Sequence, residues 1–233
     1  MMDWFAHWNA VPAALADDDV LRQVGKTVGG QPVPVSVLDA IMSDVVPALQ
    51  LNRADSLLDL CCGNGLITER GAALCHHAIG VDFSTPLIGT ANDRRSRPNV
   101  AYEQADVRTL PAGLGRYSKV LVYEGIQHLT AEDVDRVLEQ LRELHAPGAP
   151  ILFGSVPDRD RIWSFYDTPA RRDEYQRRVE DGTEAIGHWW TRSELLEMGR
   201  RWHYHVEIRP QNPTLHTAHY RFDALLTPRE VGG

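Results

Sequence analysis

The fold is decided by a stretch that reads Ser56-Leu57-Leu58-Asp59-Leu60-Cys61-Cys62-Gly63-Asn64-Gly65-Leu66-Ile67-Thr68-Glu69. Its first half is a short apolar run, typical of a strand that is buried on both faces, and two glycines follow at its end. This pattern predicts a strand, a tight loop and then a helix. The small side chains of the loop would let a ligand lie directly against backbone N–H groups at the start of the helix. The stretch is therefore typical of a nucleoside-cofactor site, although a loop that needs its glycines only for geometry would have the same pattern.

The composition favours a small-molecule partner. The 233 residues fit one generous domain, with or without a small lid, and their formal net charge is −8. Non-specific binding to nucleic acid or to an acidic membrane needs surplus lysine and arginine, so we expect neither partner. The N-terminal region has no long apolar run, and we expect a cytoplasmic protein without a signal or a membrane span. The oligomeric state stays open, with a homodimer as one alternative.

Residues 1–50 are interpreted as an N-terminal helical cap. Three aromatic residues near the start share one side of a helix, and residues 35–49 carry apolar side chains at helical spacing. A polar, glycine-rich connection lies between the two helices, at residues 23–32. Such a connection is typical of a lid or binding loop, and equally of a solvated linker in which Lys26 is simply exposed.

Residues 51–156 alternate between strand patterns and helix patterns. Short apolar runs predict five strands, at residues 56–61, 78–82, 100–106, 119–123 and 150–156. Helical patterns fall between them at residues 67–74, 86–92 and 131–145. Strands connected in this way are parallel, and their carboxyl ends meet at one edge of the sheet.

Carboxylates follow two of these strands at that edge. Asp82 ends the second strand, and the crossover places it beside Gly63, where its oxygens can accept the hydroxyl hydrogens of a ribose. Asp106 ends the third strand, where it can accept the exocyclic amine of an adenine while Val107 contacts the ring. An aspartate that only caps the turn from Val107 to Leu110 would give the same pattern.

The rest of the chain has a different character. Residues 157–192 interleave aromatic side chains with arginines and acids, and we expect a helical, lid-like insertion over the carboxyl edge of the sheet. A helix is predicted at residues 193–201. Alternating patterns at residues 203–208 and 219–226 predict an antiparallel hairpin, because the connection between them is too short for a helical crossover. Residues 51–233 would therefore form one α/β domain with a seven-stranded sheet.

Four motifs resemble, in order and spacing, those of the class I S-adenosylmethionine-dependent methyltransferases. They are Leu58-Asp59-Leu60-Cys61-Cys62-Gly63-Asn64-Gly65, Gly80-Val81-Asp82-Phe83-Ser84, Gln104-Ala105-Asp106-Val107 and Tyr123-Glu124-Gly125-Ile126-Gln127-His128-Leu129. The resemblance covers roughly residues 51–226, and one departure is Cys61, where glycine is usual. It implies a Rossmann-like, mostly parallel sheet with helices on both faces, S-adenosylmethionine as cofactor, and methyl transfer to a small molecule.

The cofactor-binding residues that the resemblance implies lie in these motifs. They are Asp59, Cys61, Cys62, Gly63, Asn64, Gly65, Asp82, Phe83, Asp106, Val107, Tyr123 and Glu124.

Catalysis in such a protein is an in-line displacement, in which alignment of nucleophile, methyl group and sulfur supplies much of the acceleration. A hydroxyl acceptor, on a sugar or a secondary metabolite, benefits from a base within hydrogen-bond reach. His128 is the first candidate, because it follows the fourth strand and imidazole titrates in the useful range. His128 could equally have no catalytic role and only line the acceptor pocket. Glu124 and His188 are second candidates.

Other functions fit parts of the pattern. Gly63 and Gly65 half match the dinucleotide fingerprint of NAD-type oxidoreductases, but Thr68 replaces the third small residue, and Asp59 would repel an anionic pyrophosphate. N- or C-methylation, a non-methylating reaction such as cyclisation, and a non-catalytic binding protein also remain open. Histidines near the C-terminus, His203 and His205 among them, could suggest a metal, but no cysteine or carboxylate set completes a site, and we expect none.

Overall fold

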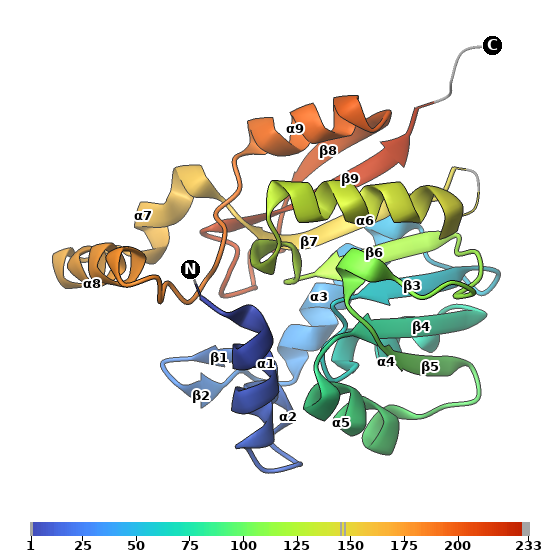
Figure 1. Ribbon diagram of the computed structural model, residues 1–233, viewed down its shortest axis with the longest axis horizontal. Coiled ribbons are helices and arrows are strands. Elements are labelled where there is room, and N and C mark those ends of the chain that lie inside the picture. The colour runs from blue at the N-terminus through green and yellow to red at the C-terminus, as the bar shows by residue number, and fades with distance from the viewer. Residues whose placement is uncertain (1, 145, 147, 230–233) are drawn as a thin grey trace.

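The computed structural model describes residues 2–144, 146 and 148–229. Its centre is a seven-stranded sheet in the order β5-β4-β3-β6-β7-β9-β8 (Figure 1). The pairs from β5 to β7 are parallel, whereas β9 is antiparallel to both β7 and β8. This is the Rossmann-like architecture that the sequence predicted, with the C-terminal hairpin inserted so that its second strand lies beside β7.

The strands of this sheet follow the predicted apolar runs closely. They are β3 (Ser56–Leu60), β4 (His77–Asp82), β5 (Val100–Gln104), β6 (Lys119–Tyr123), β7 (Ile151–Pro157), β8 (Tyr204–Pro210) and β9 (Arg221–Pro228). All seven residues of β7 are buried, as expected for a strand covered on both faces.

Helices cover both faces of the sheet (Figure 1). Their bounds are α3 (Ser36–Leu49), α4 (Leu66–Ala72), α5 (Thr85–Arg95), α6 (Ala131–Leu144) and α9 (Arg192–Arg201). One core cluster joins α6 and α9 to one face, through side chains such as Leu138 and Met198, and a second joins α3, α4 and α5 to the other face, through Ile41 and Ile88. Burial of side chains of this size stabilises the fold by about 1.5–3 kcal/mol each. The predicted end of the fourth of these helices at His145 lies outside the described residues.

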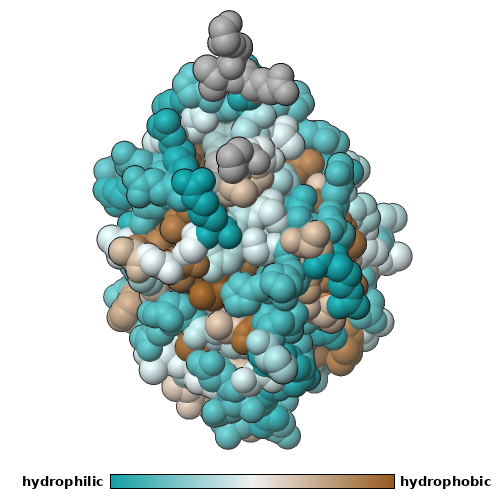
Figure 2. Space-filling view, turned by 90° about the vertical axis from the view of Figure 1, so that its right-hand side faces the viewer, coloured by the Kyte–Doolittle hydropathy of each residue, from teal (hydrophilic) through white to brown (hydrophobic). Residues whose placement is uncertain are grey.

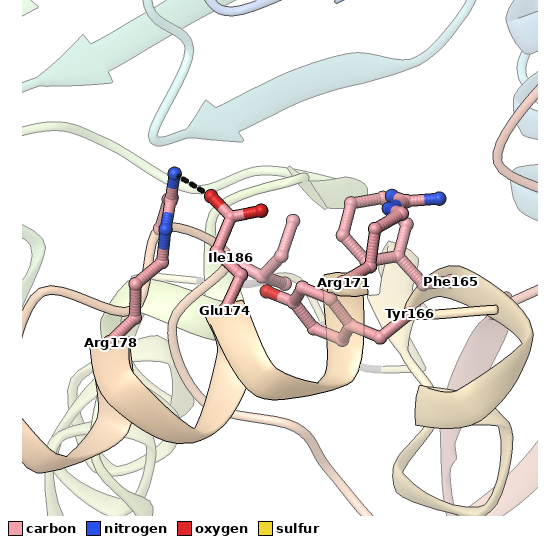
Figure 3. Close-up of a pocket in the computed structure, with 7 residues that line it drawn as sticks. Phe165, Tyr166, Arg171, Glu174, Arg178 and Ile186 are labelled. Atoms are coloured by element: carbon pink, nitrogen blue, oxygen red, sulfur yellow. Dashed lines mark hydrogen bonds and ion pairs between the residues drawn. The ribbon is translucent and has the colours of Figure 1, made fainter. Parts of the chain in front are cut away.

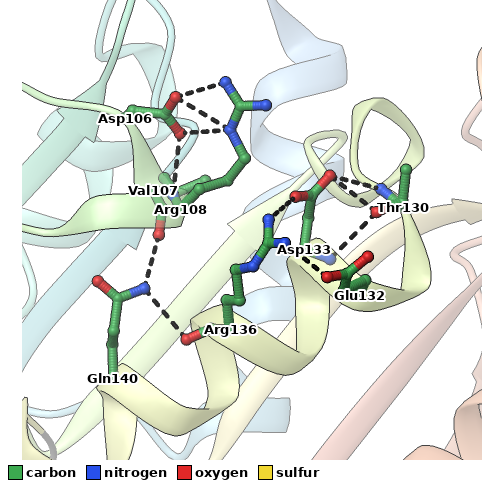
Figure 4. A network of polar contacts seen from close by, with 8 residues as sticks. All are labelled: Asp106, Val107, Arg108, Thr130, Glu132, Asp133, Arg136 and Gln140. Carbon is green, nitrogen blue, oxygen red and sulfur yellow. Dashed lines mark hydrogen bonds and ion pairs between the residues drawn. The ribbon is translucent and has the colours of Figure 1, made fainter.

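The start of α6 is fixed by its cap. The Thr130 N–H and hydroxyl both donate to Asp133 Oδ2, and the Asp133 N–H donates to Thr130 Oγ1 at 3.1 Å (Figure 4). This reciprocal pair satisfies N–H groups that the first turn leaves free. Thr130 is therefore the cap of α6.

The N-terminal segment contains α1 (Trp4–Ala13), α2 (Val20–Gln23) and a short hairpin of β1 (Thr27–Val28) and β2 (Gln31–Pro32). The hairpin was not predicted. Its two-residue turn, Gly29-Gly30, has φ of 57° and 75°, values that glycine adopts without strain and that match the twist of a tight hairpin. Lys26, just before β1, has only 7% of its surface exposed. The interpretation of this connection as a solvated linker with an exposed Lys26 was therefore wrong.

The segment between β7 and α9 is helical, with η3 (Arg159–Arg161), α7 (Ile162–Phe165) and α8 (Pro169–Glu180). It projects beyond the sheet on the side where α1 begins (Figure 1). Its side chains form a cluster of their own with Tyr220, the residue before β9, made of Ile162, Tyr166, Trp189 and Tyr220. We call these four residues the aromatic cluster.

The opposite side of the molecule has a different surface. Figure 2 shows mainly hydrophilic residues there, with hydrophobic residues in small separate groups. Among the described residues, no helix combines the length and the apolar character needed to cross a bilayer.

Candidate active site

The loop after β3 brings backbone and small side chains to the carboxyl edge of the sheet. Gly63 and Gly65 have φ of 56° and 79°. A Cβ at Gly65 would lie 2.6 Å from the Tyr102 ring, and one at Gly63 would lie 2.9 Å from Val24. Both positions therefore require glycine for conformation and for space. Cys61 has a φ of 58°, which costs a residue with a side chain about 1–3 kcal/mol and agrees with glycine being usual there.

Asp82 lies where the crossover predicts. The Gly63 N–H donates to its Oδ2 at 2.9 Å, and the Ser84 N–H donates to its Oδ1 at 2.9 Å. The carboxyl group is 7% exposed, and burial raises its pKa, although these backbone hydrogen bonds offset part of the shift. An acid held in this way by the loop itself has a fixed position for accepting hydrogen bonds from a ligand lying along the loop.

Asp59 lies deeper, in β3, with 2% of its surface exposed. Thr68, in α4, donates its hydroxyl to Asp59 Oδ2 at 2.6 Å. Burial raises the pKa of Asp59 to about 7, against the lowering effect of this hydrogen bond and with a smaller contribution from Asp82. Thr68, the residue that departs from the dinucleotide fingerprint, is thus the hydrogen-bond partner of Asp59, and a nearby cationic ligand would favour the carboxylate.

Asp106 is paired to its own turn. Its carboxylate accepts from the Arg108 N–H at 2.9 Å and from the Arg108 guanidinium at 2.6–3.0 Å (Figure 4). Partial burial would raise the pKa of Asp106, but the hydrogen bonds and charge of Arg108 outweigh it and lower the pKa. Gln140, on α6, donates to the Val107 carbonyl at 3.2 Å and fixes the turn. Asp106 therefore caps the turn η1 (Val107–Thr109), and binding of an adenine amine would have to share its oxygens with Arg108.

Asn64 and Phe83 are engaged by the N-terminal segment. Asn64 donates its side-chain amide to the Val20 carbonyl at 2.8 Å and to Gln23 Oε1 at 2.9 Å. The Phe83 ring stacks on Phe5 with 5.1 Å between centroids. The side-chain amide of Asn64 thus joins the loop to α2.

The two cysteines of the loop pack against glycines. A Cβ at Gly125 would lie 2.5 Å from Cys61 Cβ, and one at Gly80 would lie 2.8 Å from Cys62 Sγ. Burial, together with the nearby Asp82 and Asp59 carboxylates, raises the pKa of both thiols well above the usual value. They are therefore space-filling thiols rather than nucleophiles at neutral pH.

A chain of polar contacts begins just after β6. Lys26 Nζ lies 2.8 Å from Glu124 Oε2, and the Ser155 hydroxyl donates to Glu124 Oε1 at 3.1 Å. Burial would raise the pKa of Glu124, but the charges of Lys26 and Arg221 and the hydrogen bonds lower it to about 2. Glu124 and Ser155 have φ of 54° and 59°, a strained conformation for residues with side chains.

Tyr123, the last residue of β6, is buried, and the Gln211 amide donates to its hydroxyl at 3.4 Å.

The candidate base His128 lies under the N-terminal helix. Its ring lies 4.2 Å from Trp4 and 5.5 Å from Trp8, centroid to centroid, and its Nδ1 is buried without a hydrogen-bond partner among the described residues. Burial, with smaller effects from Arg221 and His7, lowers the pKa of His128 to about 3. The imidazole is therefore neutral at physiological pH and a weak base.

The third candidate, His188, lies at the far end of the helical segment. Its N–H donates to the Gln127 carbonyl at 2.7 Å, while its ring packs on Trp190 and its Nε2 lies 4.0 Å from Glu194. Burial lowers the pKa of His188. The backbone of His188 therefore joins the turn that carries His128, but its ring lies near the start of α9.

The helix α1 packs on the residues that follow β4 and on His128, after β6. The Ser84 hydroxyl donates to the Trp8 carbonyl at 2.6 Å, and the Thr85 N–H donates to Asn9 Oδ1 at 3.2 Å. Together with Lys26, these contacts hold the first thirty residues against the carboxyl edge of the sheet. Sequence reasoning missed Lys26 and Arg221 as site residues, because each reaches the site from a segment far away in the chain and belongs to no motif.

A separate pocket of about 170 Å³ lies within the helical segment (Figure 3). It is lined by Phe165, Tyr166, Arg171, Glu174, Arg178, Ala185 and Ile186. Both arginines already have acidic partners, at 3.0 Å for Arg171 with Asp167 and 2.5 Å for Arg178 with Glu174. Small-molecule sites usually occupy 300–1,000 Å³, so this pocket alone is too small for a metabolite of that kind. Elsewhere among the described residues, no group of three or more histidine, cysteine or acidic side chains is arranged to hold a metal ion.

Comparison with known proteins finds a methyltransferase domain in part of the chain. A family model described as a methyltransferase domain matches residues 57–148, which include the β3 loop and Asp82. The architecture is the fold of the class I S-adenosylmethionine-dependent methyltransferases. S-adenosylmethionine is the cofactor of this family.

Two similar proteins are methyltransferases named for quinone compounds. A 2-phytyl-1,4-naphtoquinone methyltransferase of Trichormus variabilis is 32% identical over 102 residues, or 41% of this chain and 44% of that protein. A ubiquinone biosynthesis O-methyltransferase of Methylococcus capsulatus is 31% identical over 147 residues, or 61% and 60%. The chain thus spans about half the length of the curated relatives that it matches.

Solved structures agree on the fold. A magnesium protoporphyrin IX methyltransferase of Synechocystis with bound S-adenosylhomocysteine has a TM-score of 0.60 at 12% identity, covering 97% of this chain and 93% of that one. A methyltransferase of Methanosarcina mazei has a TM-score of 0.61 at 15% identity, covering 80% and 97%.

Proposed function

We propose that this methyltransferase transfers the methyl group of S-adenosylmethionine to a hydroxyl oxygen of a small-molecule metabolite. The observation that carries the proposal is the hydrogen bond from the Gly63 N–H to the Asp82 carboxylate, beside the strained loop at Cys61. This geometry supports binding of a ribose at Asp82. Asp59, close behind the loop, supports a cationic cofactor, because a positive charge would favour its carboxylate form.

We place the binding site of the acceptor on the side of β3 that faces β6, away from β4 and β5. If residues after β4 and β5 hold the nucleoside and the β3 loop holds the rest of the cofactor, the acceptor would lie toward the ends of β6, β7 and β9, on the other side of β3. Residues 1–50 and the helical segment at 157–192 meet at this place, where Gly187 approaches Trp4. We propose that these two segments are the cap and lid of the acceptor site, and that closure aligns nucleophile, methyl group and sulfur.

The side chains near this place favour an acceptor that loses its proton easily. The pKa of His128 is about 3 and that of Glu124 is about 2, and both are low for a base that removes a proton at neutral pH. An acidic hydroxyl, such as a phenol, needs little help, whereas a sugar hydroxyl needs more. Amines and activated carbons are equally independent of a base, so N- or C-methylation is the second candidate.

Cofactor binding and methyl transfer test this proposal together. Isothermal titration calorimetry with S-adenosylmethionine is compared for the wild type, Asp82→Asn and the control Asp93→Asn, an exposed residue of α5. We expect Asp82→Asn to weaken binding at least tenfold, because charge-assisted hydrogen bonds contribute about 1.5–3 kcal/mol, and Asp93→Asn to leave it unchanged. Methyl transfer is followed as S-adenosylhomocysteine released with a panel of phenols, sugars and amines. Equal binding by wild type and Asp82→Asn would contradict the placement of the ribose, and turnover of sugars alone would contradict the acidic acceptor.

A further inference from the structure

Arg221 is a buried cation that forms no direct ion pair among the described residues. Three lysine or arginine residues are buried in the part of the chain that the structure describes: Lys26, Arg95 and Arg221. Lys26 lies 2.8 Å from Glu124, and Arg95 lies 3.7 Å from Glu69. Arg221, only 6% exposed, has no carboxylate within 4.0 Å among the described residues. A buried charge without a partner costs free energy, so this position calls for an explanation.

The contacts of Arg221 leave part of its guanidinium free. Nη1 donates to the Ser155 carbonyl at 2.5 Å, and the group lies over the Tyr220 ring at 5.2 Å from its centroid. Nε is buried and has no hydrogen-bond partner in the described residues. The nearest acid along the strand, Asp223, instead accepts from the Ser155 N–H at 2.7 Å. Arg221 therefore keeps both a full charge and an unused donor.

The position of Arg221 in the sheet separates it from the cofactor loop. Arg221 is the first residue of β9, which lies two strands beyond β6 and three beyond β3. Neighbouring strands are about 4.8 Å apart, so β9 lies roughly 10 Å from β6 along the edge of the sheet. Arg221 is thus on the acceptor side of the site, and Ser155 and Glu124 connect it to Lys26.

The side chains around Arg221 also indicate that the ligand has an aromatic ring. Tyr220, directly before Arg221, packs with Trp189 at 5.9 Å and with Phe165 at 4.6 Å between centroids. These rings belong to or border the aromatic cluster, which meets the guanidinium through Tyr220. A cation next to aromatic rings is suited to a flat, apolar molecule with an anionic group.

We propose that Arg221 binds an oxyanion, a carboxylate or an ionised hydroxyl, on an aromatic acceptor. This inference rests on the proposed methyl transfer and specifies the acceptor class. Lys26 does not serve the same purpose, because Glu124 already neutralises it. The cofactor also has a carboxylate, on its methionine part, but Arg221 lies on the far side of β6 from the loop that would hold it.

Benzoate and benzamide form a matched pair of probes, because they have nearly the same shape and the neutral carboxamide lacks the anionic oxygen of the carboxylate. Binding of each is measured by calorimetry to the full chain saturated with S-adenosylhomocysteine, for wild type, Arg221→Lys, Arg221→Met and the control Arg200→Met, an exposed residue of α9. We expect the wild type and the Arg200 variant to prefer benzoate at least tenfold. Arg221→Lys should keep part of this preference, and Arg221→Met should abolish it while binding S-adenosylhomocysteine normally.

Each other outcome has a definite meaning. Equal binding of the two probes by the wild type, or binding of neither, overturns the inference even if Arg221→Met fails to fold. A loss of S-adenosylhomocysteine binding in folded Arg221→Met would assign the anion to the cofactor and overturn the acceptor role. Failure of the wild type to bind S-adenosylhomocysteine at all would instead contradict the proposed function.

Discussion

Replacing Lys26 by methionine tests whether the N-terminal segment is held to the sheet by one buried ion pair. Methionine keeps the apolar stem of the side chain and removes the ammonium that lies 2.8 Å from Glu124 Oε2. Glu124 would then keep only the Ser155 hydroxyl and the more distant Arg221 charge as stabilising contacts. We expect lower stability and a looser cap over the cofactor loop.

The size of the effect follows from the pKa of Glu124. The folded protein lowers this pKa from 4.5 to about 2, which corresponds to about 3 kcal/mol of stability at neutral pH, most of it due to Lys26 and Arg221. Loss of one member of a buried pair typically costs about 3–5 kcal/mol, a similar value. A lowered pKa in the folded state stabilises above pH 4.5 and ceases to do so as the pH falls toward 2. The difference between wild type and variant should therefore shrink over that interval.

Urea unfolding of four proteins measures the interaction: wild type, Lys26→Met, Glu124→Gln and the double variant. We expect a coupling free energy of about 2 kcal/mol at neutral pH, because the two side chains are in direct contact. Lys26→Arg keeps the charge and should lose much less stability than Lys26→Met. A coupling below about 0.5 kcal/mol, or a loss in Lys26→Met that does not change with pH, would refute the reasoning.

Three further predictions concern the loop and the end of the helical segment. Gly187→Ala should destabilise the protein by about 1–3 kcal/mol, because φ is 97° and the new Cβ would lie 2.3 Å from the Gln127 carbonyl oxygen. The control Gly89→Ala, in an open helical position, should stabilise it by about 0.5–1 kcal/mol in the same thermal unfolding assay. The folded protein raises the pKa of Asp59 from 3.8 to about 7, so the free energy of unfolding of the cofactor-free protein should fall as the pH rises over that interval. Affinity for S-adenosylmethionine, measured by calorimetry, should rise through pH 7 as the carboxylate forms. Opposite trends would contradict this prediction. Cys61 and Cys62 should react slowly with iodoacetamide at neutral pH and rapidly in urea, and fast labelling of the folded chain would show that burial does not suppress their thiolates.

The sheet could be predicted from the sequence because its signals are local. Apolar runs such as the one in β6 are short, bounded and buried, so their length and boundaries identified them as strands. The hairpin of β1 and β2 was missed because each strand has only two residues, and the pattern of a linker is the same. The left-handed conformations of Glu124 and Ser155 were also not predictable, because neither residue type indicates a positive φ.

Some residues of the candidate site could be predicted from the sequence, and others could not. Asp82 could be placed beside Gly63, because a crossover connection fixes which strand ends are neighbours. Lys26 and Arg221 reach the site from positions 98 residues before Glu124 and 66 residues after Ser155, and no motif spacing records such pairs. The position of His128 after β6 could be predicted, but the cover of Trp4 and Trp8, which buries its ring and lowers its pKa, could not.

The central claim is that the loop from Cys61 to Gly65, with Asp82, binds S-adenosylmethionine. Calorimetric titration of the full chain with S-adenosylhomocysteine and, separately, with NAD tests it most directly. We expect saturable binding of S-adenosylhomocysteine at one site per chain and no binding of NAD. The Asp82→Asn variant should bind S-adenosylhomocysteine at least tenfold more weakly. Binding of NAD, or of neither compound, would contradict it.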